Sequence, residues 1–149
     1  MYTIGLLTPE HFHWAVHVAG KNMLMHEVKR PELYHRESLE GLANKMMMEG
    51  TGILAFYEGK PIGAIGGVLV PNIYNPNIIV LSELMWYVLP KYRNGRAGLL
   101  LIKAFKKLAE ELADEATLSI LPSSDVKPET LEKLGFKLGE SAFLFKKGN

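Results

Sequence analysis

A basic loop containing glycine stands between an apolar stretch that ends at Pro90 and a strongly amphipathic helical stretch. Gly95 and Gly98 let the backbone approach a bound group closely. Arg93 and Arg96 carry planar guanidinium groups that match phosphate oxygens. The first N–H groups of the following helix lack partners within the helix and supply about half a positive charge. This order of strand, loop and helix predicts a site for a phosphorylated ligand.

Glu83 is the only acidic residue within the apolar stretch 78–89. An unpaired carboxylate is costly in a buried strand, which favours a chemical task for it. A carboxylate can take a proton from a bound group, directly or through water. The alternative is that Glu83 points to solvent near a strand end. Strand alternation places it on the face of Met85 and Tyr87 unless a β-bulge intervenes.

Hydrophobic periodicity and turn residues predict the element order β-α-α-β-β-β-α-β-α-β. A hairpin turn is expected at residues 58–60, a helix stop at Gly50, and a right-handed parallel crossover over residues 78–121. We therefore expect a single α/β domain with a mixed sheet over residues 1–149. The expected strands cover residues 2–7, 52–57, 61–70, 78–89, 116–121 and 137–147, and the expected helices cover residues 8–21, 37–49, 95–115 and 128–134.

The composition excludes several classes of protein. The chain has no cysteine, which excludes disulfides and a cysteinyl acyl-enzyme and suits a reducing cytoplasm. A net charge of +1 gives no electrostatic reason to expect nucleic acid or an anionic membrane as a partner. No apolar stretch approaches the ~20 residues that a spanning helix needs. We expect a cytoplasmic protein.

The segment around the basic loop resembles the acetyl-CoA signature of the GNAT superfamily of N-acetyltransferases. Val88, Pro90, Arg93 and Gly98 stand where that family has its Val-x-Pro and Gln/Arg-x-x-Gly-x-Gly/Ala positions. The order of elements is also similar over nearly the whole chain, including a closing Lys-Leu-Gly-Phe at residues 133–136. The stretch 83–98 is similar to the variant found in small bacterial and phage GNAT proteins. The resemblance implies a fold with a splayed central sheet, and acetyl-CoA or another acyl-CoA as cofactor.

The resemblance also implies roles for individual residues. The backbone of Trp86, Tyr87 and Val88 pairs with the pantetheine arm as if it were another strand, and Arg93 belongs to the same cofactor site. The N–H groups of the loop and helix start hold the pyrophosphate. Ser123 and Ser124 follow a strand near the thiol end of the cofactor, although Ser124 with Asp125 is equally a plain turn. The pyrophosphate-binding residues are Asn94, Gly95, Arg96, Ala97 and Gly98.

Two positions depart from the family pattern. Arg96 replaces the first signature glycine, which is harmless if the residue is already helical and weakens the site otherwise. Leu131 stands where many members have a tyrosine that protonates the leaving thiolate. The proton donor is therefore another group or water, or turnover is lost.

Tyrosines and a histidine near the expected site are candidates for the remaining roles. Tyr87 is a candidate proton donor, and Tyr34, His35 and Tyr74 lie in loops expected to flank the acceptor. Ordinary amphipathic packing is the alternative for each tyrosine. His13 and His17 lie one helical turn apart but lack a carboxylate in a metalloprotease pattern, so no metal site is expected.

The sequence therefore predicts an N-acyltransferase that transfers an acetyl or other acyl group from acyl-CoA directly to a primary amine. Glu83 assists deprotonation, and a backbone N–H near Tyr87 or Val88 polarises the thioester carbonyl. The acceptor is an amine of a small molecule or a protein, and family analogy suggests a homodimer. The alternative is a GNAT fold without turnover that serves as a binding or regulatory module.

Overall fold

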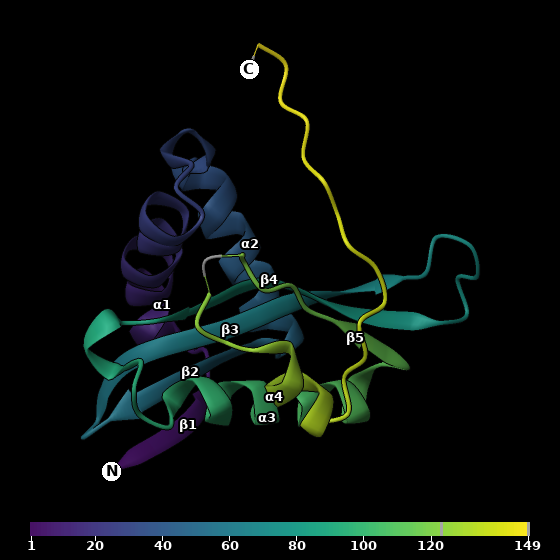
Figure 1. Cartoon of the computed structure of the whole chain (residues 1–149). Helices are drawn as coiled ribbons and strands as arrows, with labels where there is room; N and C mark the ends of the chain where they lie inside the picture. The colour runs from purple at the N-terminus through teal and green to yellow at the C-terminus, as the bar shows by residue number, and fades with distance from the viewer. Residues whose placement is uncertain (123, 149) are drawn as a thin grey trace.

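A five-stranded sheet with the order β1-β2-β3-β4-β5 forms the centre of the computed structural model, which describes residues 1–122 and 124–148 (Figure 1). The first four strands are antiparallel neighbours, and β4 and β5 are parallel. The mixed α/β class expected from the sequence is therefore confirmed. The strands are β1 Tyr2–Leu6, β2 Gly52–Tyr57, β3 Lys60–Pro71, β4 Ile79–Val88 and β5 Glu115–Thr117.

The predicted hairpin between β2 and β3 is confirmed. Glu58 and Gly59, its two central residues, both have positive φ, 48° and 81°. Two successive positive φ values define the type I′ turn, whose twist matches that of the flanking strands. Glycine tolerates this conformation readily, which is why the turn forms where the sequence places Glu-Gly.

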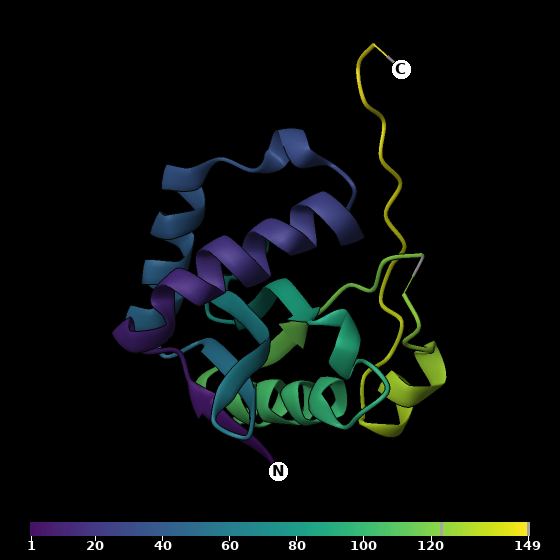
Figure 2. The same cartoon turned by 90° about the vertical axis from the view of Figure 1, so that its left-hand side faces the viewer.

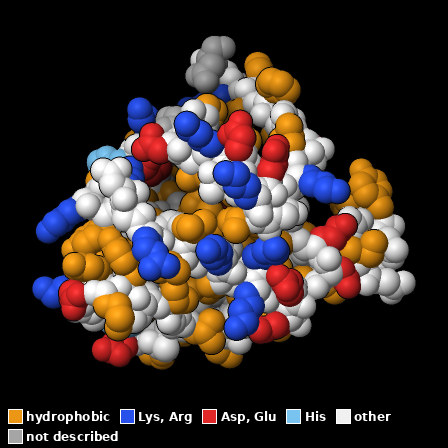
Figure 3. Space-filling model, turned by 60° about the horizontal axis from the view of Figure 1, so that its bottom comes forward, with side chains coloured by type: hydrophobic (Ala, Val, Ile, Leu, Met, Phe, Trp, Pro, Cys, Tyr) orange, Lys and Arg blue, Asp and Glu red, His pale blue; other side chains and the backbone are white. Residues whose placement is uncertain are grey.

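Helices cover both faces of the sheet (Figures 1 and 2). On one face lies α3, Ala97–Leu112, whose Leu101 and Phe105 are fully buried against the sheet. Burial of a side chain such as Phe105 contributes about 1.5–3 kcal/mol. The outer side of α3 exposes lysines and glutamates, as expected, and charges of both signs are interspersed over this surface (Figure 3).

The other face carries the N-terminal helices. The expected end of the first helix near Gly20 is wrong, because the helix continues to Glu27. A Cβ at Gly20 would lie 3.0 Å from Leu39 Cδ2, so this glycine permits a close helix crossing and is not a stop signal. Gly50, with φ of 73°, ends α2 as predicted. The helical segments are Pro9–His11, α1 Phe12–Trp14, the π-helical Ala15–Gly20 and Met23–Glu27, Pro31–Leu33, and α2 Arg36–Glu49.

The C-terminal part differs from the expectation. Helix α4, Pro128–Lys133, is present, but β5 ends at Thr117 and does not extend to residue 121. The expected closing strand over residues 137–147 is also wrong, because this described segment is not a strand and runs away from the sheet (Figure 1). Its apolar residues face solvent, with Phe143 96% and Phe145 84% exposed. A strand pattern specifies no partner edge, and here the segment finds none.

Candidate functional site

The end of β4 leads into α3 through a short turn. Leu89 N–H donates to Ile62 O (2.8 Å), and a 3-10 helix follows over Pro90–Tyr92. Arg96 precedes α3 with φ of −89° and ψ of −6°, which is right-handed backbone that any residue adopts. The arginine at the signature's first glycine position therefore does not distort the loop. No side chain caps this helix end, which leaves its first N–H groups available to an anion.

Gly95 holds the loop against the edge of the sheet. A Cβ at this position would lie 3.0 Å from Tyr2 Cζ on β1, so a side chain there requires the tyrosine to move. Tyr2 itself packs on Tyr57 (5.0 Å between ring centroids), and Tyr57 packs on Tyr92 (5.5 Å). This aromatic row fixes the position of the loop relative to β1 and β2.

Arg93 has partners within the protein. Its Nε donates to Val88 O (2.8 Å), and its guanidinium forms an ion pair with Glu27 at the end of the first helix. The guanidinium also lies 5.4 Å from the centre of the Tyr87 ring. Arg93 therefore ties the loop to β4 and to the N-terminal helices, and it does not extend freely toward solvent as a phosphate fork would.

The sheet opens after Ser82. The pairing between β4 and β5 joins Val80 to Glu115, Leu81 to Ala116 and Ser82 to Thr117, whereas β4 continues to Val88. Within residues 1–122 and 124–148, no strand pairs with the β5 side of residues 83–88. The predicted splay is therefore present, and it exposes backbone groups of β4 beside the start of α3.

A β-bulge interrupts β4 at the point where the sheet opens. Gly66 pairs with Met85 and Gly67 pairs with Glu83, so Leu84 is an extra residue without an opposite partner. A Cβ on Gly67 would lie 2.8 Å from the carbonyl carbon of Ser82, which only glycine avoids. The bulge is therefore built on a close approach of two backbones.

The bulge changes which face each residue of β4 occupies. Leu81 and Trp86 both pack in the core beneath α3, whereas Met85 and Tyr87 pack with the N-terminal helices. Glu83 alternates with Leu81 and therefore does not share the face of Tyr87. The bulge thus moves Glu83 off the face of Met85 and Tyr87, on which strict strand alternation would place it.

Glu83 and Tyr87 have raised pKa values for the same physical reason. Burial raises the pKa of the Glu83 carboxyl, and the Ser119 N–H that donates to it (3.1 Å) offsets part of this rise. A carboxylate with a raised pKa is a stronger base than an ordinary glutamate. Burial also raises the pKa of Tyr87, which is 5% exposed and keeps its proton at neutral pH. Leu131 is buried in α4, so the usual tyrosine position belongs to the core here.

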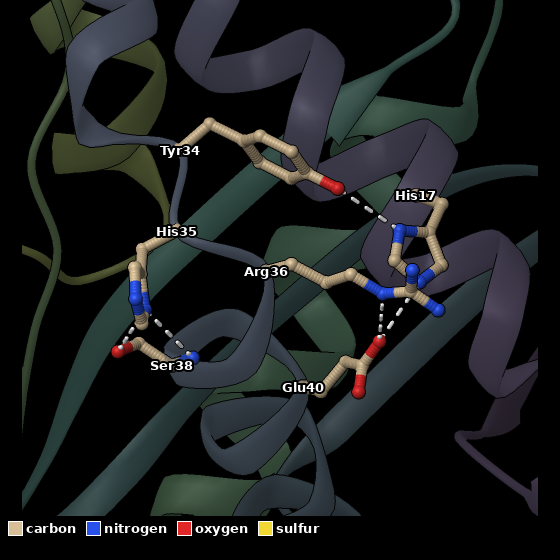
Figure 4. A network of polar contacts seen from close by, with 6 residues as sticks. All are labelled: His17, Tyr34, His35, Arg36, Ser38 and Glu40. Carbon is tan, nitrogen blue, oxygen red and sulfur yellow. Dashed lines mark hydrogen bonds and ion pairs between the residues drawn. The ribbon is translucent and has the colours of Figure 1, made fainter.

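Tyr34 and His35, two of the three residues expected to flank the acceptor substrate, make polar contacts between the N-terminal helices (Figure 4). The Tyr34 hydroxyl lies 3.1 Å from His17 Nδ1, and His17 Nε2 lies 3.2 Å from Glu40 Oε1. Arg36 donates to the same carboxylate (2.9 Å). His35 Nδ1 accepts the Ser38 N–H (3.3 Å) and thereby caps α2.

The structure does not bring Tyr74 and Ser124 to these groups. Tyr74 is 94% exposed in the loop between β3 and β4, at the opposite end of β4 from Val88. The Ser124 hydroxyl accepts the Val126 N–H (3.1 Å), and the Ser124 N–H donates to Leu121 O (2.9 Å), which is the plain turn of the alternative interpretation. Ser123 lies outside the described residues.

His13 and His17 stack on each other with ring centroids 4.6 Å apart. Among the described residues, no group of three or more His, Asp or Glu side chains is placed to hold a metal ion. In the same part of the chain, no helix is long and apolar enough to cross a membrane.

Residues 21–136 match the family model described as the acetyltransferase (GNAT) family, which covers more than half of the chain. The protein belongs to the GNAT acetyltransferase family. No curated protein sequence matches this chain.

Solved structures of other GNAT proteins share the fold at low sequence identity. One is a predicted acetyltransferase with acetyl-CoA from Clostridium acetobutylicum, with a TM-score of 0.76, 14% identity and coverage of 98% of this chain and 96% of that one. A ribosomal-protein-alanine N-acetyltransferase from Brucella melitensis biovar Abortus 2308 has a TM-score of 0.72 at 16% identity, covering 100% and 99%. An aminoglycoside acetyltransferase from an uncultured soil metagenomic sample, in complex with sisomicin, has a TM-score of 0.70 at 16% identity, covering 97% and 94%.

The sequence interpretation did not identify four residues that shape this site. The Gly66-Gly67 pair inside a strand was an available signal for the bulge, since glycine there often marks one. Glu27 and Ser119 carry no local signal, because each acts on a residue far along the chain: Glu27 on Arg93 and Ser119 on Glu83.

Proposed function

We propose that this GNAT protein transfers an acetyl group, or another acyl group, from acyl-CoA to a primary amine of a small molecule or a protein. The observation that carries the proposal is the coincidence of two features at one end of β4. The strand leaves β5 after Ser82 and exposes its backbone edge, and the uncapped start of α3 lies at the end of that same edge. An extended arm ending in a pyrophosphate matches both features.

The residues present fit such a donor. The backbone of Trp86, Tyr87 and Val88 would pair with the pantetheine arm. The N–H groups of the loop and helix start would hold the pyrophosphate, from Asn94, Gly95, Arg96, Ala97 and Gly98. Gly98 leaves room, because a Cβ there would only reach ordinary contact with Trp86 (3.9 Å). Arg93 would act by fixing the loop, through its hydrogen bond to Val88 O and its ion pair with Glu27.

The chemistry assigned to the protein is proton transfer and polarisation. The acyl-CoA supplies a thioester carbonyl that the acceptor amine attacks, forming the N–C bond while the C–S bond breaks. Glu83 takes the amine proton, directly or through water, with its base strength increased by burial. A backbone N–H near Tyr87 or Val88 polarises the carbonyl oxygen. Tyr87 gives its proton to the leaving thiolate and recovers it from solvent.

The amine acceptor would approach between the N-terminal helices and β4. Tyr34 and His35 lie on this side, in the connection that leads into α2. The absence of cysteine from the sequence and the dependence on acyl-CoA support a cytoplasmic location.

The proposal is tested by two variants of one residue. Gly98→Asp places a carboxylate in the first turn of α3, which stabilises an isolated helix by about 0.3–1 kcal/mol but repels a pyrophosphate. Gly98→Ala is the matched control. In thermal shift measurements, acetyl-CoA at a hundred times its Kd stabilises the native protein by about 2.7 kcal/mol. We expect the wild type and Gly98→Ala to show this stabilisation and Gly98→Asp to lose it while remaining folded.

Turnover is measured as thiol release from acetyl-CoA with a panel of primary amines. If no CoA ester stabilises the wild type at millimolar concentration, the proposed function is wrong. If CoA esters bind but no amine in a broad panel releases thiol, the alternative of a binding or regulatory protein is favoured.

The proposal includes a homodimer formed through the C-terminal segment. Phe143 and Phe145 are exposed on a segment whose alternation predicts a strand, and β5 is the edge strand of the sheet. A second copy would offer its own β5 edge to this segment, and two-fold symmetry would satisfy both copies at once. Light scattering should give the mass of a dimer for the wild type and of a monomer for a Phe143→Ser, Phe145→Ser double variant. A wild type that remains monomeric at high concentration would contradict this assembly.

A further inference from the structure

An apolar cavity of about 240 Å³ lies on the face of the sheet opposite α3. It is enclosed by the N-terminal helices, by α2 and by strands β2 to β4. The side chains that matter here come from each of these elements: Met23, Leu39, Leu42, Met46, Leu84 and Met85. The volume exceeds the ~150 Å³ of an apolar cavity that takes up benzene. A ring with a few carbons attached, or a medium aliphatic chain, therefore fits.

Polar groups are confined to one part of the lining. Of the described residues that line the cavity, His35 and Ser38 alone have polar side chains, and none has a charged one. Ser38 N–H donates to His35 Nδ1, so Nε2 is the ring nitrogen that this contact leaves for a ligand. The nearby carboxylate of Glu40 is already bound by Arg36 and His17. A polycation would find no free carboxylate in this lining, and burying its charges there would be unfavourable.

The cavity reaches the reaction centre of the proposed enzyme. Leu84 and Met85, which line it, follow Glu83 directly and form the bulge. Leu84 is 43% exposed, so this side of the cavity adjoins solvent where the sheet opens. A ligand held in the cavity would thus place a group attached to its outer end beside the exposed edge of β4.

Three methionines make the cavity adaptable. Met23, Met46 and Met85 come from three different elements, and unbranched thioether side chains fit ligands of varied outline. The surrounding contacts are tight, since a Cβ on Gly66 would lie 2.8 Å from Met46 Sδ. The empty space is therefore local and is not a sign of loose packing throughout this layer.

From this geometry we infer that the cavity binds the apolar body of the acceptor, and that the substrates are primary amines bearing an aromatic ring or an aliphatic chain. The inference rests on the proposed function and narrows it. It excludes polyamines and aminoglycosides as good acceptor substrates, because their many ammonium groups need carboxylates. It also predicts that the apolar chain belongs to the amine and not to the acyl group.

The first experiment measures kcat/KM for straight-chain primary amines with acetyl-CoA as donor. Burial of each added CH₂ should increase kcat/KM about fourfold until the cavity is full, because each contributes about 0.8 kcal/mol. Ethanolamine and spermidine should be poor acceptors. Leu42→Trp should abolish the dependence on chain length while acetyl-CoA binding is kept, and Gly41→Ala, an exposed neighbour on α2 with open space around it, should behave like the wild type.

A second measurement needs neither turnover nor a folded variant. The neutral dye N-phenyl-1-naphthylamine should fluoresce when it binds the wild type, and octylamine should displace it, whereas spermidine should not. Displacement by long-chain acyl-CoA but not by octylamine would assign the cavity to the acyl group and overturn the inference. Absence of dye binding, or equal kcat/KM for ethanolamine and octylamine, would also overturn it. If octylamine displaces the dye but the wild type binds no CoA ester, the proposed function is refuted and the apolar binding site is not.

Discussion

Gly67→Ala tests whether the bulge sets the position of Glu83. Gly67 lies directly opposite Glu83 on the neighbouring strand. A Cβ there would lie 2.8 Å from the Ser82 carbonyl carbon and 3.0 Å from Glu83 Cα, and closer still to the Ser82 oxygen. These are backbone atoms that cannot rotate away. The two strands must therefore separate at the point where the sheet opens.

The expected loss of stability has two parts. Overpacking typically destabilises by about 1–3 kcal/mol, and displacement of Glu83 weakens its hydrogen bond from Ser119, worth about 0.5–1.5 kcal/mol. The sum, about 1.5–4.5 kcal/mol, leaves a typical domain folded, because typical domains have about 5–15 kcal/mol of stability. Turnover should fall further than stability implies, since misplacing a catalytic group by 1 Å reduces rates about a hundredfold.

Urea unfolding and thiol release measure the two effects of Gly67→Ala on the same preparation. The control Gly41→Ala, in the interior of α2 with nothing near its added Cβ, should be more stable than wild type by roughly 0.5–1 kcal/mol. A Gly67→Ala protein with the stability and turnover of the wild type would refute the role given to the bulge.

The remaining predictions concern the two charged groups of the site. Because burial raises the folded-state pKa of Glu83, the native protein binds the proton more tightly, so its unfolding free energy falls as pH rises from the ordinary glutamate range through that raised pKa. Glu83→Gln should show a smaller fall between pH 5 and pH 8 in urea unfolding, and lower turnover with acetyl-CoA affinity unchanged; a wild-type pH profile or wild-type turnover would remove Glu83 from the mechanism. Glu27→Gln frees Arg93, and calorimetry should show weaker acetyl-CoA binding if Arg93 acts by fixing the loop, as should Arg93→Ala. Tighter binding by Glu27→Gln would show instead that Arg93 contacts phosphate directly.

Local signals in the sequence predicted the parts of the fold that local physics decides. Positive φ at Gly59 and Gly50 follows from the lack of a Cβ, so the hairpin and the end of α2 were predictable. Gly20 misled for the opposite reason: its role is a tertiary contact with Leu39, which lies on another helix. A glycine has the same appearance in the sequence whether it ends a helix or admits a neighbour.

For the candidate site, too, local patterns were readable from the sequence and long-range contacts were not. The loop between Pro90 and Gly98 has a continuous pattern in the sequence, and in the structure it joins β4 to α3. What orients Glu83 and Arg93 was not predictable, because Ser119 and Glu27 reach them through the folded chain. The alternation of residues 137–147 specifies a strand but no partner, and so predicted an element that this chain does not form by itself.

The bulge affects how the proposed base and the proposed acceptor can meet. It places Glu83 on the face of Leu81, whereas the apolar cavity lies on the face of Met85, so base and acceptor begin on opposite sides of β4. The Glu83 carboxylate, however, accepts the N–H of Ser119, two residues beyond the last pair between β4 and β5. It therefore lies in the gap between the diverging strands. In the proposed reaction, an amine held in the cavity would reach the carboxylate through this gap, because no ladder of hydrogen bonds closes it.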